Sequence, residues 1–165
     1  MQKIILTVIL IVSFFNLDAQ LVKIYGYKQR IQGGMRMEGD QKNKEDEQSR
    51  FFIVAETRKN TKIQLQQVWI NGQSFLFTAD TIKRFPFVLE SSNGGELVNR
   101  DTLIKVSKNE VILLKNLSKT KSFTATAATK KLIAANAVVI LYKYAGKRSV
   151  ATLRRLHIIS PLFTQ

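Results

Sequence analysis

Apolar and polar residues alternate over short stretches along most of this chain, which is the pattern of β-strands. The clearest stretch is 62–78, where such runs lie on both sides of Asn71-Gly72. Asn-Gly between two strand-like runs predicts a β-hairpin, because a type I′ turn needs positive φ at both central residues. Trp69, the only tryptophan, shares a strand parity with Ile63 and Leu65, so we expect these three side chains to occupy one face.

The same pattern predicts further short strands bounded by turn residues. Pro86 marks one of them as an edge strand, since proline has no N–H to donate to a ladder. Residues 136–144 are apolar on both parities, which is typical of a centrally buried strand. A second hairpin turn is expected at Ala145-Gly146, and Pro161 is expected to end the last strand. The further strands are expected at residues 21–29, 51–56, 85–89, 102–106, 110–117, 136–144 and 149–159, with turns at 58–61, 90–96 and 107–109.

The stretch after residue 117 fits two structures. Phe123, Ala125 and Ala127 alternate with threonines, which suits a strand. Residues 127–137 also suit a short helix, and the sequence alone leaves both alternatives open.

Short strands at this spacing predict an all-β domain, specifically an immunoglobulin-like antiparallel β-sandwich of about seven to eight strands. No alternation of strands with helices is visible, which argues against an α/β enzyme fold. We find no internal repeat or interdomain linker, so residues 20–165 are expected to form a single domain. Near residues 30–49 the apolar periodicity is lost and charges of both signs mix, which indicates an exposed, mobile loop.

The N-terminus has the pattern of a secretory leader. Lys3 precedes an apolar run at residues 4–15, and Ala19-Gln20 offers a small residue for cleavage, so residues 1–19 are predicted to be a signal peptide. The alternative is an uncleaved anchor, but the run is short of the roughly 20 residues that cross a bilayer. The protein is therefore expected to be exported to the periplasm, the outer envelope or the extracellular space, with no transmembrane span after cleavage.

Composition limits the chemistry and gives the chain a strong charge. There is no cysteine, which excludes disulfides, thiol catalysis and cysteine-ligated metals. The 26 Lys and Arg residues against 12 Asp and Glu residues give a formal net charge of +14. No acidic residue follows Glu110, although ten basic residues do. Charge of one sign attracts anionic partners, or simply keeps a protein soluble.

Three short segments carry a resemblance to a known group of proteins. Residues 68–72, 111–115 and 138–144, the last followed by Gly146-Lys147, resemble small uncharacterised exported β-sandwich proteins of Bacteroidota. The resemblance covers roughly residues 51–162, and the leader ending in Ala19-Gln20 is similar to those of secreted proteins from the same phylum. It implies an exported β-sandwich, but its motifs are structural and transfer no functional residues.

Familiar catalytic and metal-binding patterns are missing from the sequence. His157 is the only histidine, no Gly-x-Ser-x-Gly elbow accompanies it, and there is no Walker-type phosphate loop. One histidine without cysteine is too few for a zinc site. We therefore predict a protein that is not an enzyme and has no cofactor or metal. The enzyme alternative is a hydrolase that uses the loop carboxylates Glu45, Asp46 and Glu47.

The candidate binding residues lie near the C-terminus. Tyr142 and Tyr144 stand next to cations close to Gly146, and stacking combined with charge can bind single strands or sugars. The competing interpretation is that Tyr142 continues an apolar core face and the cations surround a turn. The candidate anion-binding residues are Lys143, Lys147, Arg148, Arg154 and Arg155.

Two functional hypotheses follow from these features. The main one is an exported, non-enzymatic binding or envelope-associated module with a protein or envelope partner. The alternative is a basic protein that binds an anionic polymer, such as lipopolysaccharide, an acidic glycan or nucleic acid.

Overall fold

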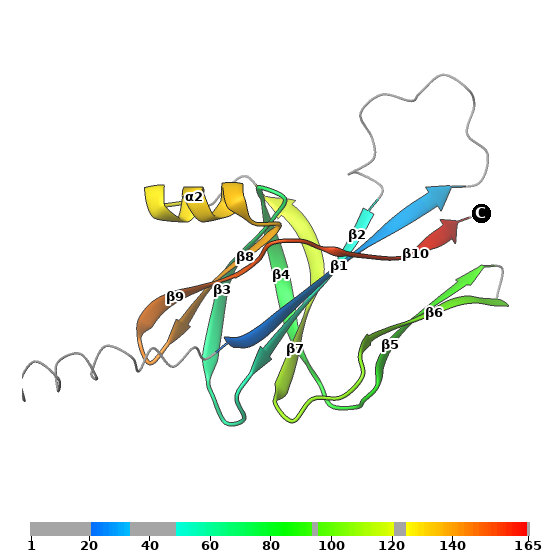
Figure 1. Cartoon of the computed structure of the whole chain (residues 1–165), viewed down its shortest axis with the longest axis horizontal. Coiled ribbons are helices and arrows are strands. Elements are labelled where there is room, and N and C mark those ends of the chain that lie inside the picture. Colours follow the sequence, from blue (N-terminus) through cyan, green and yellow to red (C-terminus); the bar gives the residue numbers. More distant parts are fainter. Residues whose placement is uncertain (1–20, 34–48, 94–95, 121–124, 165) are drawn as a thin grey trace, which may run out of the picture.

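The computed structural model describes residues 21–33, 49–93, 96–120 and 125–164, and these form a strongly curled sheet with a small second layer and one short helix (Figure 1). The predicted signal peptide and most of the predicted loop near 30–49 lie outside the described residues. The elements are β1 (Leu21–Gly33), β2 (Ser49–Thr57), β3 (Ile63–Ile70), β4 (Gln73–Ile82), β5 (Phe87–Asn93), β6 (Glu96–Ile104), β7 (Glu110–Thr120), α2 (Ala127–Ala135), β8 (Val138–Tyr144), β9 (Lys147–Leu153) and β10 (His157–Thr164).

Eight of the strands belong to one mixed sheet, in the order β10-β1-β2-β7-β4-β3-β8-β9. Neighbours are antiparallel except β1 and β10, which run parallel. Strands β5 and β6 pair only with each other among the described residues. The all-β prediction is therefore confirmed. The immunoglobulin-like sandwich is not, because eight strands share one continuous ladder instead of dividing into two sheets of similar size.

The two edges of this sheet meet at Gly26. Strands β9 and β10 lie at opposite edges, yet only residues 154–156 separate them in the chain, so the sheet has to curl. A Cβ added to Gly26 on β1 would stand 2.7 Å from methyl groups of Leu153 and Leu156. A side chain at this position would have to displace these leucine methyl groups, so glycine allows the close approach. The edges therefore close on each other through packed side chains, and the apolar face is enclosed.

The enclosed face holds the main hydrophobic core. Strand parity places alternate residues on it, and each large side chain removed from water here contributes roughly 1.5–3 kcal/mol. Its buried members come from β1, β2, β3, β4, β7 and β8: Ile24, Ile53, Val68, Ile70, Phe75, Leu114, Val138 and Ile140.

A β-bulge in β3 changes the face on which Trp69 lies. The register with β8 shifts between Leu65 and Gln67. Odd-numbered residues before this point therefore face the same side of the sheet as even-numbered residues after it. Ile63 and Leu65 pack with the enclosed residues, as Ile70 does, whereas Trp69 alternates with Ile70 and points to the outer face. The prediction of a shared face for Ile63, Leu65 and Trp69 is therefore wrong. Trp69 is nevertheless buried, at 4 % exposure.

The two predicted hairpin turns are confirmed. Asn71 and Gly72 have φ values of 47° and 81°, as a type I′ turn requires, and they join β3 to β4. Ala145 and Gly146 have φ values of 46° and 77° and join β8 to β9.

The hairpin formed by β5 and β6 makes a second layer over the outer face of β1, β2 and β7 (Figure 1). Leu103 and Ile104 from β6 pack there against Val54 of β2. The Tyr27 hydroxyl donates to the carbonyl oxygen of Leu103, and burial raises the pKa of Tyr27 above its usual value of 10.0, with a smaller contribution from Tyr25. A local two-layer arrangement thus exists on one side of the curled sheet.

The structure decides between the two alternatives left open after residue 117, and it corrects several predicted boundaries. Residues 127–135 are helical, so the helix alternative is correct, and the Thr126 hydroxyl caps the helix by accepting from the Thr129 N–H. The predicted turn at 90–96 is too long, since β5 continues to Asn93 and β6 begins at Glu96. The last predicted strand is two strands, β9 and β10. Pro161 does not end β10, which tolerates it as an edge strand.

The predicted loop near 30–49 also begins too early. Strand β1 extends to Gly33, and Arg30 pairs with Ser49 at the start of β2.

Candidate functional site

Strands β2 and β7 separate part of the way along the sheet. Their ladder runs from Thr57–Glu110 to Ile53–Leu114, and no further pair is formed among the described residues. Beyond this point β2 continues beside β1, whereas β7 continues beside β4 and curves toward α2 (Figure 1). Two strands that are neighbours at one end are therefore apart at the other.

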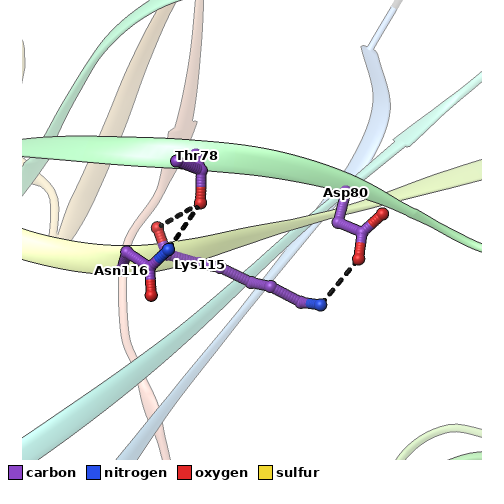
Figure 2. Close-up of polar contacts among 4 residues, drawn as sticks. All are labelled: Thr78, Asp80, Lys115 and Asn116. Atoms are coloured by element: carbon purple, nitrogen blue, oxygen red, sulfur yellow. Dashed lines mark hydrogen bonds and ion pairs between the residues drawn. The ribbon is translucent and has the colours of Figure 1, made fainter.

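A bulge at Asn116 accompanies the separation. Asn116 has a φ of 53°, and the register between β4 and β7 shifts between Leu76 and Thr78. Asparagine tolerates this left-handed conformation better than most residues, and a bulge bends its strand. The Asn116 side-chain amide donates to the Thr78 hydroxyl at 3.0 Å, and that hydroxyl donates to the Lys115 carbonyl at 3.4 Å (Figure 2). These contacts fix β7 in its bent course.

A pocket of about 660 Å³ lies where the strands separate. Phe51 belongs to the enclosed core and Phe52 to the outer cluster, so the pocket borders both apolar clusters at once. The rings of Phe51 and Phe75 meet edge to face, with centroids 6.0 Å apart. The apolar wall consists of Phe51, Phe52, Phe75, Phe87, Leu89, Leu113, Leu114 and Leu117.

The polar part of the lining is rich in cations. It consists of Ser49, Arg50, Lys115, Asn116 and Lys119. The Lys115 ammonium group lies 2.6 Å from a carboxylate oxygen of Asp80 (Figure 2). This hydrogen bond, together with the positive charge of Lys115, lowers the pKa of Asp80 from its usual 3.8.

The other two cations of the lining differ from Lys115. Arg50 and Lys119 are exposed, and among the described residues neither has an acidic side chain within salt-bridge distance. In the described part of the chain, the pocket therefore combines an apolar wall with two cations that form no ion pair.

The predicted anion-binding residues divide into two separate places. Lys143 stands directly opposite Arg148, and Tyr144 stands opposite Lys147, next to the turn at Ala145-Gly146. Arg154 and Arg155 are exposed in the segment between β9 and β10, beyond the Val138–Leu153 end of the same ladder. Six residue steps of strand span about 20 Å, so the structure does not bring the five cations together.

Tyr142 belongs to the core. Its side chain is 5 % exposed and packs with Leu21 and Ala55, as the competing interpretation of the sequence predicts. The reason is parity, because Tyr142 is two and four residues beyond Ile140 and Val138 on the enclosed face. Tyr144 is the aromatic residue that remains at the surface near this turn, at 36 % exposure.

His157 and the acidic side chains are the other groups that could carry chemistry. His157 is exposed on β10, and its ring lies 5.9 Å from that of Tyr27. Within the described ranges, no three His, Asp or Glu side chains are close enough together to hold a metal ion. The carboxylates Glu45, Asp46 and Glu47 lie outside the described residues. The described part of the chain also contains no helix with the length and apolarity to cross a bilayer.

The pocket residues were not among those predicted from the sequence. One local indication was available: an asparagine within a predicted strand is unusual and favours a bulge, and Asn116 is such a residue. The separation of Arg50 and Phe51 from β7 could not be deduced locally, since β2 and β7 are more than fifty residues apart in the chain.

No protein-family model matches this chain, and no curated protein or solved structure matches it either. Its function therefore has to be argued from the geometry of the pocket and from the distribution of charge.

Proposed function

We propose that this protein is an exported, non-enzymatic binding module whose ligand occupies the pocket between β2 and β7. The observation that carries the proposal is the apolar pocket of about 660 Å³ at the point where two neighbouring strands separate. Binding sites for small ligands are commonly apolar hollows of roughly 300–1,000 Å³ with a few polar groups at defined positions. The size and lining of this pocket match that description.

The lining supports binding over catalysis. General acid–base chemistry needs a titratable group within hydrogen-bond reach of the reacting atom, most often histidine or a carboxylate. The described residues that line the pocket include neither of these. Their polar groups are a hydroxyl, an amide and three cations, which can orient a ligand.

The leader supports export. Lys3, the apolar run at 4–15 and Ala19-Gln20 follow the order of a cleaved signal peptide. Intact-mass measurement of the protein from envelope and culture fractions should give a chain that begins at Gln20. A full-length chain found only in the cytoplasm would contradict export, and the binding proposal would then stand without it.

Binding at the pocket can be tested with a neutral apolar fluorophore, N-phenyl-1-naphthylamine, whose emission rises in apolar surroundings. Leu117 is a half-buried wall residue, and an indole at this position would occupy space that the probe needs. Leu117→Trp should therefore weaken probe binding by about tenfold or more.

The control is Leu132→Trp, which places the same side chain on the exposed face of α2. It should bind the probe like the wild type. Leu89→Trp gives a second obstruction of the wall from β5, and circular dichroism shows whether each variant is folded. Wild-type protein that does not bind the probe, or equal binding by all folded variants, would contradict the proposal.

A second candidate function, binding of an anionic polymer, is favoured by one feature of the turn between β8 and β9. Lys143 and Arg148 are directly opposite each other on neighbouring strands. Like charges in this relation destabilise a sheet, and a polyanion would relieve their repulsion. Lys147 adds a third cation at the same turn. An envelope polysaccharide, lipopolysaccharide or nucleic acid would supply the opposite charge.

A further inference from the structure

We infer that the ligand of the β2–β7 pocket is an anionic amphiphile, with one apolar chain against the phenylalanine and leucine wall and an anionic head group between Arg50 and Lys119. The inference rests on the proposed function, because it names the class of ligand for the same pocket.

The charges of the pocket lining favour an anionic head group. Arg50 lies on β2 and Lys119 on β7, so they reach the pocket from its two sides. Both are exposed and neither has an acidic partner among the described residues, whereas Lys115 is paired with Asp80. An arginine can hold a carboxylate or phosphate through two parallel hydrogen bonds, and a lysine adds a point charge. A neutral head group would form no ion pair with either cation.

The apolar wall favours a hydrocarbon chain as the rest of the ligand. The Phe51, Phe75 and Leu117 side chains present carbon atoms to the pocket, and a hydrocarbon chain gains affinity from being removed from water there. Each buried methylene strengthens binding by about fourfold. A polysaccharide or nucleic acid backbone would place hydroxyl or phosphate groups against this wall, where they would lose their hydrogen bonds to water.

The bulge argues against a peptide strand as the ligand. A strand that pairs in the space between β2 and β7 would need two regular edges within hydrogen-bond reach. Asn116 has positive φ within β7 and interrupts the edge on that side. An apolar chain has no such requirement, because packing is not directional.

The experiment is displacement of bound N-phenyl-1-naphthylamine by three ligands with the same twelve-carbon chain: dodecanoate, dodecyl phosphate and dodecanol, all below their aggregation concentrations. The two anions should bind the wild type about tenfold more tightly than the alcohol, because a charge-assisted hydrogen bond replaces a neutral one. The carboxylate and phosphate arms identify which anionic head the pocket prefers. Decanoate should bind about sixteenfold more weakly than dodecanoate, since two fewer methylenes are buried and each contributes about fourfold.

The decisive variant is the double substitution Arg50→Gln with Lys119→Gln. It should reduce the anion preference to less than about threefold by lowering the affinity for the two anions, and circular dichroism should show the native fold, because both side chains are exposed and contribute little to folding. The matched control is Lys130→Gln with Lys131→Gln, which removes the same charge from the exposed surface of α2. The control should keep the full preference.

The outcomes separate this inference from the proposed function. If the probe binds and the alcohol competes as well as the anions, the inference is wrong and the binding function stands. If the preference survives in the Arg50→Gln, Lys119→Gln variant, or disappears equally in the α2 control, the head group is not held by these two cations and the inference is overturned. If the wild type binds neither probe nor amphiphile, the proposed function itself has failed.

Discussion

Two regions of the described structure each contain three cations, and they differ in what lies beneath the charge. At the β2–β7 pocket, Arg50, Lys115 and Lys119 accompany a hollow with an apolar wall. At the other region, the tight turn between β8 and β9 (Figure 1), Lys143, Lys147 and Arg148 lie on the last residues of the two strands. The pocket wall remains open to a ligand, whereas Tyr142 beside the turn is buried in the core.

This difference has a physical origin in strand pairing. The β8–β9 ladder continues without interruption to the turn, so Tyr142 packs in the core while Lys147 and Arg148 are exposed. Among the described residues the β2–β7 ladder stops at Ile53–Leu114, so beyond that pair each of these two strands is paired on one side only. Similar numbers of cations thus accompany different surroundings, and the proposed ligand site depends on the interrupted ladder more than on the charge.

The largest expected effect concerns the cost of removing an aromatic ring from each region. Phe75 is 4 % exposed and belongs to both the core and the pocket wall, so Phe75→Ala should lower the free energy of unfolding by about 3–5 kcal/mol. Tyr144 is partly exposed next to the turn, and Tyr144→Ala should cost less than about 1 kcal/mol. Urea denaturation followed by circular dichroism measures both. Equal losses would show that the two regions are packed alike.

Much of the local structure followed from the sequence. The turns at Asn71-Gly72 and Ala145-Gly146, and the assignment of Tyr142 to the core face, depend on neighbouring residues that the sequence displays directly. The helix at 127–135 was one of two alternatives because its residues suit either state, and no buried residue fixes it. Local patterns were reliable where the strands are regular.

The global arrangement could not be deduced in the same way. Whether ten strands form one curled sheet or two stacked sheets depends on pairs distant in the chain, such as β1 with β10 and β2 with β7. The bulges after Leu65 and at Asn116 also change strand parity without a clear pattern in hydrophobicity. The pocket depends on both features, so it appears only when the chain is folded.

The second prediction compares the two type I′ turns. Gly146 at the cationic turn has φ of 77° and Gly72 at the other turn has φ of 81°, conformations that strain a residue with a Cβ. No side chain lies within 4 Å of either added Cβ, so the cost is conformational and should be about 1–2 kcal/mol for each glycine-to-valine change. Thermal unfolding measures it.

The same two variants also test whether the regions are independent. Binding of N-phenyl-1-naphthylamine should be unchanged by Gly146→Val, because the β8–β9 turn is not part of the pocket lining. A large loss of probe affinity in a folded Gly146→Val protein would show that the two regions are coupled.

The third prediction asks whether the cationic turn binds a polyanion. If it does, the affinity for single-stranded DNA should fall as salt rises, since bound cations release counterions from the nucleic acid. The triple substitution of Lys143, Lys147 and Arg148 by Gln should then flatten the log–log salt slope by about 2. Fluorescence anisotropy at several salt concentrations measures the slope. The double variant Lys130→Gln, Lys131→Gln controls for net charge, and an equal slope in wild type and triple variant would leave these cations as solubilising charges.

The smallest expected effect comes from Asp80, which neutralises one of the three pocket cations. Asp80→Asn should release Lys115 and raise the affinity of dodecyl sulfonate, which stays anionic at every pH used, by about two- to fourfold, the range of an exposed ion pair.

The pKa of Asp80 is lowered in the folded protein by its hydrogen bond to Lys115, so the pair contributes to stability above the unfolded pKa and this contribution is lost as the pH falls through the lowered pKa. The wild type should therefore approach the Asp80→Asn variant both in unfolding free energy and in sulfonate affinity as the pH falls through the lowered pKa of Asp80. Titration of both proteins downward from pH 7, with the protonation of Asp80 followed by NMR of its carboxyl carbon, measures this convergence. A difference that persists once Asp80 is protonated would show that Lys115 is not controlled by Asp80, and the pocket would then have three cations available to its ligand.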